Sequence, residues 1–204
     1  MDEKRIGEEE KEAIKFLERD FNQSYQQMRH YDGQMFEILK FMFTGYTTVI
    51  GVAIGLYEFG LKENKTLTAP AIAILCVGLI FGLFMFALTI RNRVYFVQVA
   101  RYINEQRKLF LVLKPMGFQN ESRMYTNCSQ PPYFNFRSSQ AWFAYIVAAL
   151  NATLVTVLSF ITCMTPAAAL GIGIGLFLAQ LVSGIVYLKS REGKSASGAV
   201  FGKE

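Results

Sequence analysis

Hydrophobic and polar residues alternate along this chain in long blocks. Four blocks hold only uncharged side chains, and each is close to the roughly 20 residues that a helix needs to cross a bilayer. Charged residues or helix breakers stand at the ends of the blocks. The pattern predicts an all-α membrane protein with four transmembrane helices. The predicted spans are Phe41–Tyr57, Ala69–Ile90, Ala141–Cys163 and Pro166–Leu188.

Before the first span, apolar residues recur at steps of three and four, which is the spacing of one face of an α-helix. The same phase continues into the span, and the turn-prone pair Asp32-Gly33 is expected to place a bend or hinge between the two. Such a seam suits contact with a second helix; the alternative is a helix lying on its own subunit or on lipid headgroups. The seam consists of Ile14, Leu17, Phe21, Ser24, Met28 and Tyr31.

The segment after the second span is predicted to continue it as a helix from Arg91 to Leu113, because no Gly or Pro interrupts it. Pro115 must end this helix, and the loop that follows carries too many rings for a disordered linker. The chain is thus divided into a cytoplasmic amphipathic arm (1–40), a first transmembrane hairpin (41–90), a basic, aromatic-rich cytoplasmic segment (91–140), a second transmembrane hairpin (141–188) and a flexible tail (189–204).

Basic residues are distributed unequally among the connections. Of the 21 Lys and Arg residues, only Lys62 and Lys65 fall between the first and second spans. Because cytoplasmic loops are enriched in Lys and Arg, both termini and residues 91–140 are expected in the cytoplasm. The acidic N-terminus lacks the basic region of a cleaved signal peptide, so the first span is expected to remain in the protein.

Composition and motifs exclude several function classes. Hydrophobic residues make up 52% of the chain and aromatic residues 14%. These fractions exceed those of ordinary soluble domains. Ion-coupled transport generally requires an ionisable group within a span. None of the four predicted spans contains an acidic, basic or histidine side chain. His30 is the only histidine, and neither a metal-ligand spacing of cysteines nor a phosphate-binding glycine loop is present. We therefore expect no enzyme activity, no metal ion and no cofactor.

Small residues recur at four-residue spacing in every span, which is typical of helices that approach one another closely. Each span thus carries at least one row of small residues, a packing ridge, which is more than a four-helix monomer needs for its core. This surplus of packing ridges predicts a homo-oligomer. Polar residues in the first and third spans are candidates for lining an aqueous pathway, while the alternative for each is ordinary hydrogen bonding between helices. The pore-lining candidates are Thr44, Thr47, Thr48, Asn151, Ser159 and Thr162.

The segment 91–140 has a net charge of +6, whereas the arm has a net charge of −3. Basic residues interleaved with Tyr and Phe suit the phosphates and stacked bases of a nucleotide or oligonucleotide. The alternative is that these charges only obey the positive-inside rule or contact anionic membrane lipid. The candidate ligand-binding residues are Arg91, Arg93, Arg101, Arg107, Lys108 and Arg123.

The arrangement of spans, arm and basic helix, including Arg91-Asn92-Arg93 and residues 101–108, resembles the membrane effectors of bacterial anti-phage defence, such as the channel partner of the Hailong nucleotidyltransferase. The resemblance covers residues 8–188 in architecture. It implies a bacterial inner-membrane location, a tetramer-like assembly opened or held shut by an oligonucleotide, a nucleotidyltransferase partner, and toxicity through depolarisation.

A second function of another class fits the same pattern. A non-conducting membrane adaptor could recruit a cytoplasmic partner protein through the arm, and it would explain the seam and the aromatic loop without a pore. Inducible expression separates the two functions, because only a pore is expected to arrest growth with loss of membrane potential.

Overall fold

The computed structural model describes residues 2–63, 66–112, 117, 119–121, 125–162 and 164–193, without the side chains of residues 2–6 and 112. Over these residues the fold is all-helical. Each helix is long and apolar enough to cross a membrane, which agrees with the predicted transmembrane protein. The helices are α1 (Asp2–Lys62), α2 (Thr68–Val112), α3 (Ser139–Ile161) and α4 (Pro166–Ser190).

The first helix, α1, is a single rod of 61 residues that joins the predicted arm to the first span. The predicted break at Asp32-Gly33 is wrong, because helical backbone continues through both residues. A glycine inside a helix costs about 1 kcal/mol relative to alanine, and contacts on both sides of it offset this cost. Tyr31 stacks on Tyr95 of α2 at 5.7 Å between ring centroids, and Met35 is 1% exposed.

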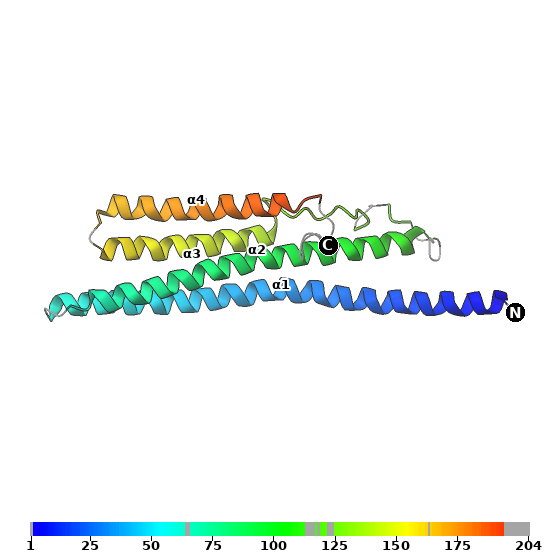
Figure 1. Ribbon diagram of the computed structural model, residues 1–204, viewed down its shortest axis with the longest axis horizontal. Helices are drawn as coiled ribbons and strands as arrows, with labels where there is room; N and C mark the ends of the chain where they lie inside the picture. The colour runs from blue at the N-terminus through cyan, green and yellow to red at the C-terminus, as the bar shows by residue number, and fades with distance from the viewer. Residues whose placement is uncertain are drawn as a thin grey trace.

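The second helix, α2, runs for 45 residues beside α1 in the opposite direction (Figure 1). Helical backbone continues without a break from the predicted second span as far as Val112. Leu113, Lys114 and Pro115, where that helix was expected to end, lie outside the described residues, as do Lys65, Arg123 and Cys163.

The two shorter helices, α3 and α4, form a hairpin that packs along the part of the α1–α2 pair away from the N-terminus (Figure 1). Each begins at a residue whose hydroxyl accepts from a backbone N–H of the first turn, which satisfies a donor that the helix leaves unpaired. Ser138 accepts from Ala141 at 3.2 Å, and Thr165 accepts from Ala168 at 3.3 Å. Pro166 then occupies the first turn of α4, where its missing N–H costs nothing.

Glycines allow the helices to approach closely within one subunit. A Cβ at Gly82 of α2 would overlap the Tyr46 hydroxyl and Asn151 Oδ1, and a Cβ at Gly173 of α4 would overlap Thr156 Oγ1. In contrast, a Cβ at Gly51, Gly55, Gly171 or Gly175 would meet nothing within 4 Å. Two of the predicted small-residue ridges, on α1 and α4, therefore face away from the subunit interior.

Candidate functional site

A buried polar network lies inside the bundle and joins all four helices. Asn151 of α3 is 0% exposed. Its Oδ1 accepts from the Tyr46 hydroxyl of α1, while its Nδ2 donates to Gly82 O of α2 at 3.1 Å and to Gln180 Oε1 of α4 at 2.7 Å. In a lipid environment these groups have few other partners. The structure thus places Asn151 among helices of its own subunit.

The other polar candidates of α3 lie near the end of that helix. Ser159 is buried, and its carbonyl accepts from the Thr162 hydroxyl at 2.9 Å and from the N–H of Met164 at 3.3 Å. Thr162 is exposed. These residues close the turn between α3 and α4.

Unlike the buried Asn151, the threonines of α1 lie on the outer surface of the bundle. The exposed residues are Thr44, Thr47 and Thr48. Thr47 Oγ1 donates to Phe43 O at 2.8 Å, and Thr48 Oγ1 donates to Thr44 O at 3.0 Å. Each hydroxyl is thereby satisfied within its own helix and keeps acceptor capacity toward the outside.

These threonines belong to a longer polar stripe on α1, whose members follow one another at steps of three and four residues and therefore share one helical face. All members are exposed, whereas Met42, Tyr46 and Ala53, which lie half a helical turn away, are buried against the rest of the subunit. The polar stripe consists of Glu37, Lys40, Thr44, Thr48, Gly51, Gly55, Glu58 and Lys62.

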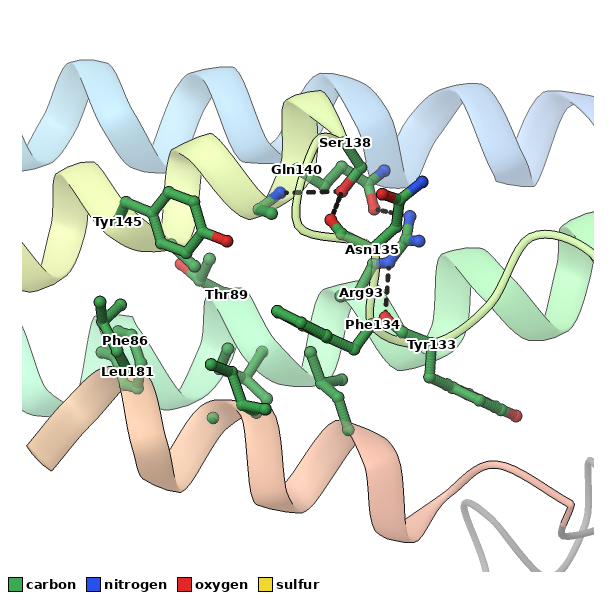
Figure 2. Close-up of a pocket in the computed structure, with 16 residues that line it drawn as sticks. Phe86, Thr89, Arg93, Tyr133, Phe134, Asn135, Ser138, Gln140, Tyr145 and Leu181 are labelled. Atoms are coloured by element: carbon green, nitrogen blue, oxygen red, sulfur yellow. Dashed lines mark hydrogen bonds between the residues drawn. The ribbon is translucent and has the colours of Figure 1, made fainter. Parts of the chain in front are cut away.

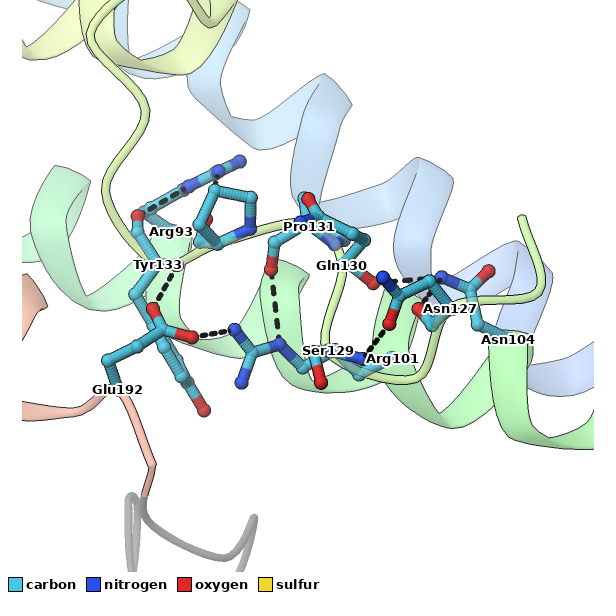
Figure 3. Close-up of polar contacts among 10 residues, drawn as sticks. Arg93, Arg101, Asn104, Asn127, Ser129, Gln130, Pro131, Tyr133 and Glu192 are labelled. Carbon is cyan, nitrogen blue, oxygen red and sulfur yellow. Dashed lines mark hydrogen bonds and ion pairs between the residues drawn. The ribbon is translucent and has the colours of Figure 1, made fainter. Parts of the chain in front are cut away.

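Among the described cations of the predicted ligand set, Arg93 is the most deeply buried, at 7% exposed. Its Nε donates to Tyr133 O at 3.0 Å, its Nη1 to Gln140 Oε1 at 2.9 Å and its Nη2 to Pro132 O at 2.7 Å (Figures 2 and 3). Burial, and then the charge of Arg101, lower the pKa of Arg93 to about 10, while Glu192 opposes the change. Arg93 stays charged at neutral pH, and its donors fasten the loop before α3.

A small cavity lies beside Arg93, between α2, α3, α4 and the loop (Figure 2). Its volume is about 30 Å³, and its walls include Phe86, Phe134, Tyr145 and Leu181. A space of this size corresponds to about one water molecule. It therefore does not hold a nucleotide in this conformation.

Arg101 lies farther along α2 under the same loop. Its Nε donates to Pro131 O at 3.1 Å, its Nη2 forms an ion pair with Glu192, and its guanidinium carbon lies 4.6 Å from the centre of the Tyr133 ring. Glu192, which follows α4, also accepts from the N–H of Tyr133 at 3.0 Å (Figure 3). Sequence reasoning missed this acidic partner, because it lies 91 residues from Arg101.

The other basic candidates that the structure describes are dispersed. Arg91 is exposed and donates to the Tyr95 hydroxyl at 2.8 and 3.0 Å. The guanidinium carbon of Arg107 lies 5.5 Å from the ring centre of Phe21 and 5.0 Å from that of Tyr125. Lys108 is exposed, and Arg123 lies outside the described residues. The structure brings Arg93 and Arg101 under one loop and does not gather Arg91, Arg107 or Lys108 beside them.

One ring of the aromatic loop, that of Tyr133, is packed inside the subunit and is 1% exposed. Burial raises the pKa of Tyr133, whereas Arg101 and a hydrogen bond from Gln98 oppose the change. Asn104 of α2 holds the earlier part of the loop, because its Nδ2 donates to Asn127 O at 3.1 Å and to Gln130 O at 2.8 Å.

The arm is attached to α2 by a polar clamp centred on Asp20. Its Oδ2 accepts from the Tyr102 hydroxyl at 2.6 Å and from Gln106 Nε2 at 2.5 Å. The hydrogen bond to Asp20, followed by burial, raises the pKa of Tyr102. The arm thus contacts its own subunit here, and an open groove of about 550 Å³ beside it is lined by the seam residues Ile14 and Phe21 together with Phe110 and Tyr125.

Within the described residues, no three His, Cys, Asp or Glu side chains group in a way that could hold a metal ion. No family model matches the chain, and neither a curated protein nor a solved structure matches it. Inferences about its function therefore depend on the residues and their geometry.

Proposed function

We propose that this protein is a homo-oligomeric membrane pore, controlled by a cytoplasmic ligand, in which the polar stripe of α1 lines the pathway. The observation that carries the proposal is the position of the stripe opposite the buried face of α1, with Thr44, Thr48, Gly51 and Gly55 exposed. Around a symmetric axis, copies of this stripe would form an uncharged polar wall with charged residues at both ends.

The interior of one subunit supports a pathway between copies rather than through a copy. Asn151, Tyr46 and Gln180 satisfy one another inside the bundle, and Gly82 leaves no room there for even one added carbon. Polar groups committed in this way hold helices together. The exposed glycines of α4, Gly171 and Gly175, supply a surface on which a neighbouring copy could pack.

The unequal distribution of Lys and Arg supports cytoplasmic termini and a cytoplasmic segment 91–140. The resemblance to anti-phage effectors supports a bacterial inner membrane, a tetramer, an oligonucleotide messenger made by a nucleotidyltransferase, and defence by depolarisation. Exposed Arg91 and Lys108 remain available to such a ligand, whereas Arg93 holds the loop and Arg101 divides its donors between the loop and Glu192.

Cysteine scanning of reconstituted protein tests the lining. In a background without Cys76, Cys128 and Cys163, Thr44→Cys and Thr48→Cys are expected to make ion flux from liposomes sensitive to a charged thiol reagent. The matched control is Val77→Cys on α2, which is 68% exposed but lies on another helix. Flux that is absent with and without nucleotides, or equal inhibition at Val77→Cys, contradicts the proposed lining.

The second candidate function, a membrane adaptor that recruits a cytoplasmic protein, is favoured by the exposed apolar residues of the arm. Ile14 and Phe16 are 50% and 64% exposed, and Ile14 also borders the open groove beside Arg107. Under this function, harmless accumulation on inducible expression is expected, together with loss of partner binding in Phe16→Ala.

A further inference from the structure

Glu192 occupies a position that is built for an anion by two other segments. One oxygen of its carboxylate pairs with Arg101 Nη2 of α2, and the other accepts from the backbone N–H of Tyr133 in the loop at 3.0 Å (Figure 3). A guanidinium combined with a backbone N–H is a strong arrangement of donors for carboxylates and phosphates alike.

Both donors are held in place by contacts that do not involve Glu192. Arg101 is fixed by its bond to Pro131 O and by the Tyr133 ring beneath it. Tyr133 is fixed by burial and by its carbonyl, which accepts from Arg93. The Arg101 side chain is 16% exposed, whereas that of Glu192 is 45% exposed. The donors of Arg101 and Tyr133 are thus held in place, and the carboxylate of Glu192 reaches them from the surface. An anion from solution can approach the donors along the same side.

The charges at this position are not balanced by Glu192 alone. Arg93 directs its three nitrogens at the neutral oxygens of Tyr133, Pro132 and Gln140. The charges of Arg101 and Glu192 both act on Arg93, after the larger effect of its burial. Arg93 and Arg101 both donate to the loop residues 131–133, so two guanidinium charges lie around the one carboxylate of Glu192. A phosphate group carries between about −1.5 and −2 charges at pH 7, with three acceptor oxygens, and matches the two cations better.

We propose that Glu192 is the internal occupant of a phosphate-binding site formed by Arg101 and the N–H of Tyr133, and that a phosphate-bearing ligand exchanges with it. When the ligand replaces the Glu192 carboxylate, the segment that follows α4 is released from α2, while Arg93 still holds the loop. The binding site is independent of the pore; its role in opening or closing one rests on the proposed function.

Calorimetric titration of the purified full chain with pyrophosphate tests the competition. Removing the internal carboxylate in Glu192→Ala is expected to strengthen pyrophosphate binding at least about tenfold, which corresponds to the loss of one charge-assisted hydrogen bond. The control Glu12→Ala removes an exposed carboxylate on the arm and is expected to bind as the original protein does. Binding by Glu192→Ala no tighter than by the control overturns the proposal.

Amide hydrogen exchange gives a second readout, at the backbone N–H of the site itself. The N–H of Tyr133 is expected to exchange faster in Glu192→Ala and to become protected again when pyrophosphate is added. Arg101→Gln is expected to abolish this recovery. Exchange that pyrophosphate leaves unchanged in folded Glu192→Ala overturns the proposal, whatever the flux assay shows.

A phosphate could come from a soluble ligand or from a lipid headgroup, and the bilayer composition distinguishes the two sources. Glu192→Ala is placed in nanodiscs of phosphatidylcholine alone or with phosphatidylglycerol. Protection of Tyr133 by pyrophosphate in both nanodiscs indicates a soluble ligand, whereas protection by phosphatidylglycerol without pyrophosphate indicates a headgroup. If neither probe protects Tyr133, the site does not bind phosphate.

Discussion

At the scale of single residues, the described spans contain two kinds of polar group. Some hold the subunit together, and others face outward. Asn151 illustrates the first kind, since its amide contacts groups on three other helices. Thr48 illustrates the second, since its hydroxyl returns to its own helix. The sequence could nominate both as polar residues in spans, but only the packing of helices distant in sequence tells which is which.

Asn151→Ala is expected to destabilise the subunit, because Tyr46, Gly82 and Gln180 each lose a buried partner. Hydrogen bonds between membrane helices average about 0.6 kcal/mol and reach about 1.7 kcal/mol, so losing several predicts a loss of about 1–3 kcal/mol. Thermal unfolding in detergent measures it. Thr153→Ala, which removes only a bond to Ala149 O in the same helix, is the control and should change stability little.

Glycine substitutions separate packing inside the subunit from packing outside it. Gly82→Ala is expected to lower the unfolding temperature, because the added methyl group overlaps the Tyr46 hydroxyl and Asn151, and overpacking costs about 1–3 kcal/mol. Gly55→Ala is expected to leave the unfolding temperature of the isolated subunit unchanged, since open space surrounds it.

A third glycine reports on assembly. Gly175 of α4 also has open space around it and lies outside the proposed lining. If the glycines of α4 contact other copies, Gly175→Ala is expected to shift the oligomer distribution measured by mass photometry or crosslinking. An unchanged distribution would argue against a close contact between subunits at Gly175.

At the scale of elements, hydrophobic blocks predicted the four helices correctly because block length and the absence of charge are enough to specify a span. The hinge at Asp32-Gly33 was predicted wrongly because local turn preference is weak compared with packing against a partner helix. Stacking of Tyr31 on Tyr95 and a bond from Asn92 to Tyr31 O at 2.7 Å depend on α2, which local sequence does not reveal.

The clamp between the arm and α2 is expected to weaken at high pH. Its hydrogen bond to Asp20 raises the pKa of Tyr102 above the usual 10.0, so the folded form binds the phenolic proton more tightly than the unfolded form. The stabilisation is therefore complete below about pH 10, and it is lost as the pH rises through the raised pKa.

Spin labels at Gln23 and Lys108, both exposed, can follow the distance between arm and α2 by electron paramagnetic resonance. The distance distribution is expected to broaden above about pH 10. Tyr102→Phe, which cannot titrate there, should show a broadened distribution already at neutral pH and less further change. A distribution in the original protein that stays narrow throughout would contradict the clamp.

At the scale of the whole molecule, the candidate ligand residues show what a single sequence leaves open. Arg93 and Arg101 follow the same helical spacing as Lys108, yet two are committed to the loop and one is exposed. Their partners, Gln140, Pro131 and Glu192, come from segments brought together only by the fold. The positive charge of the segment 91–140 could be predicted from composition. That Arg93 and Arg101 contact the loop and Glu192 of the same chain could not.

The unbroken α1 has a mechanical consequence. At 1.5 Å per residue, its 61 residues extend for about 90 Å, whereas the hydrocarbon layer is about 30 Å thick. The part outside the bilayer is thus a lever roughly twice as long as the part inside. Without a joint to absorb rotation, a twist applied near Phe21 is transmitted as torque to Thr48, so a partner or ligand that grips the outer end can turn the membrane-embedded end directly.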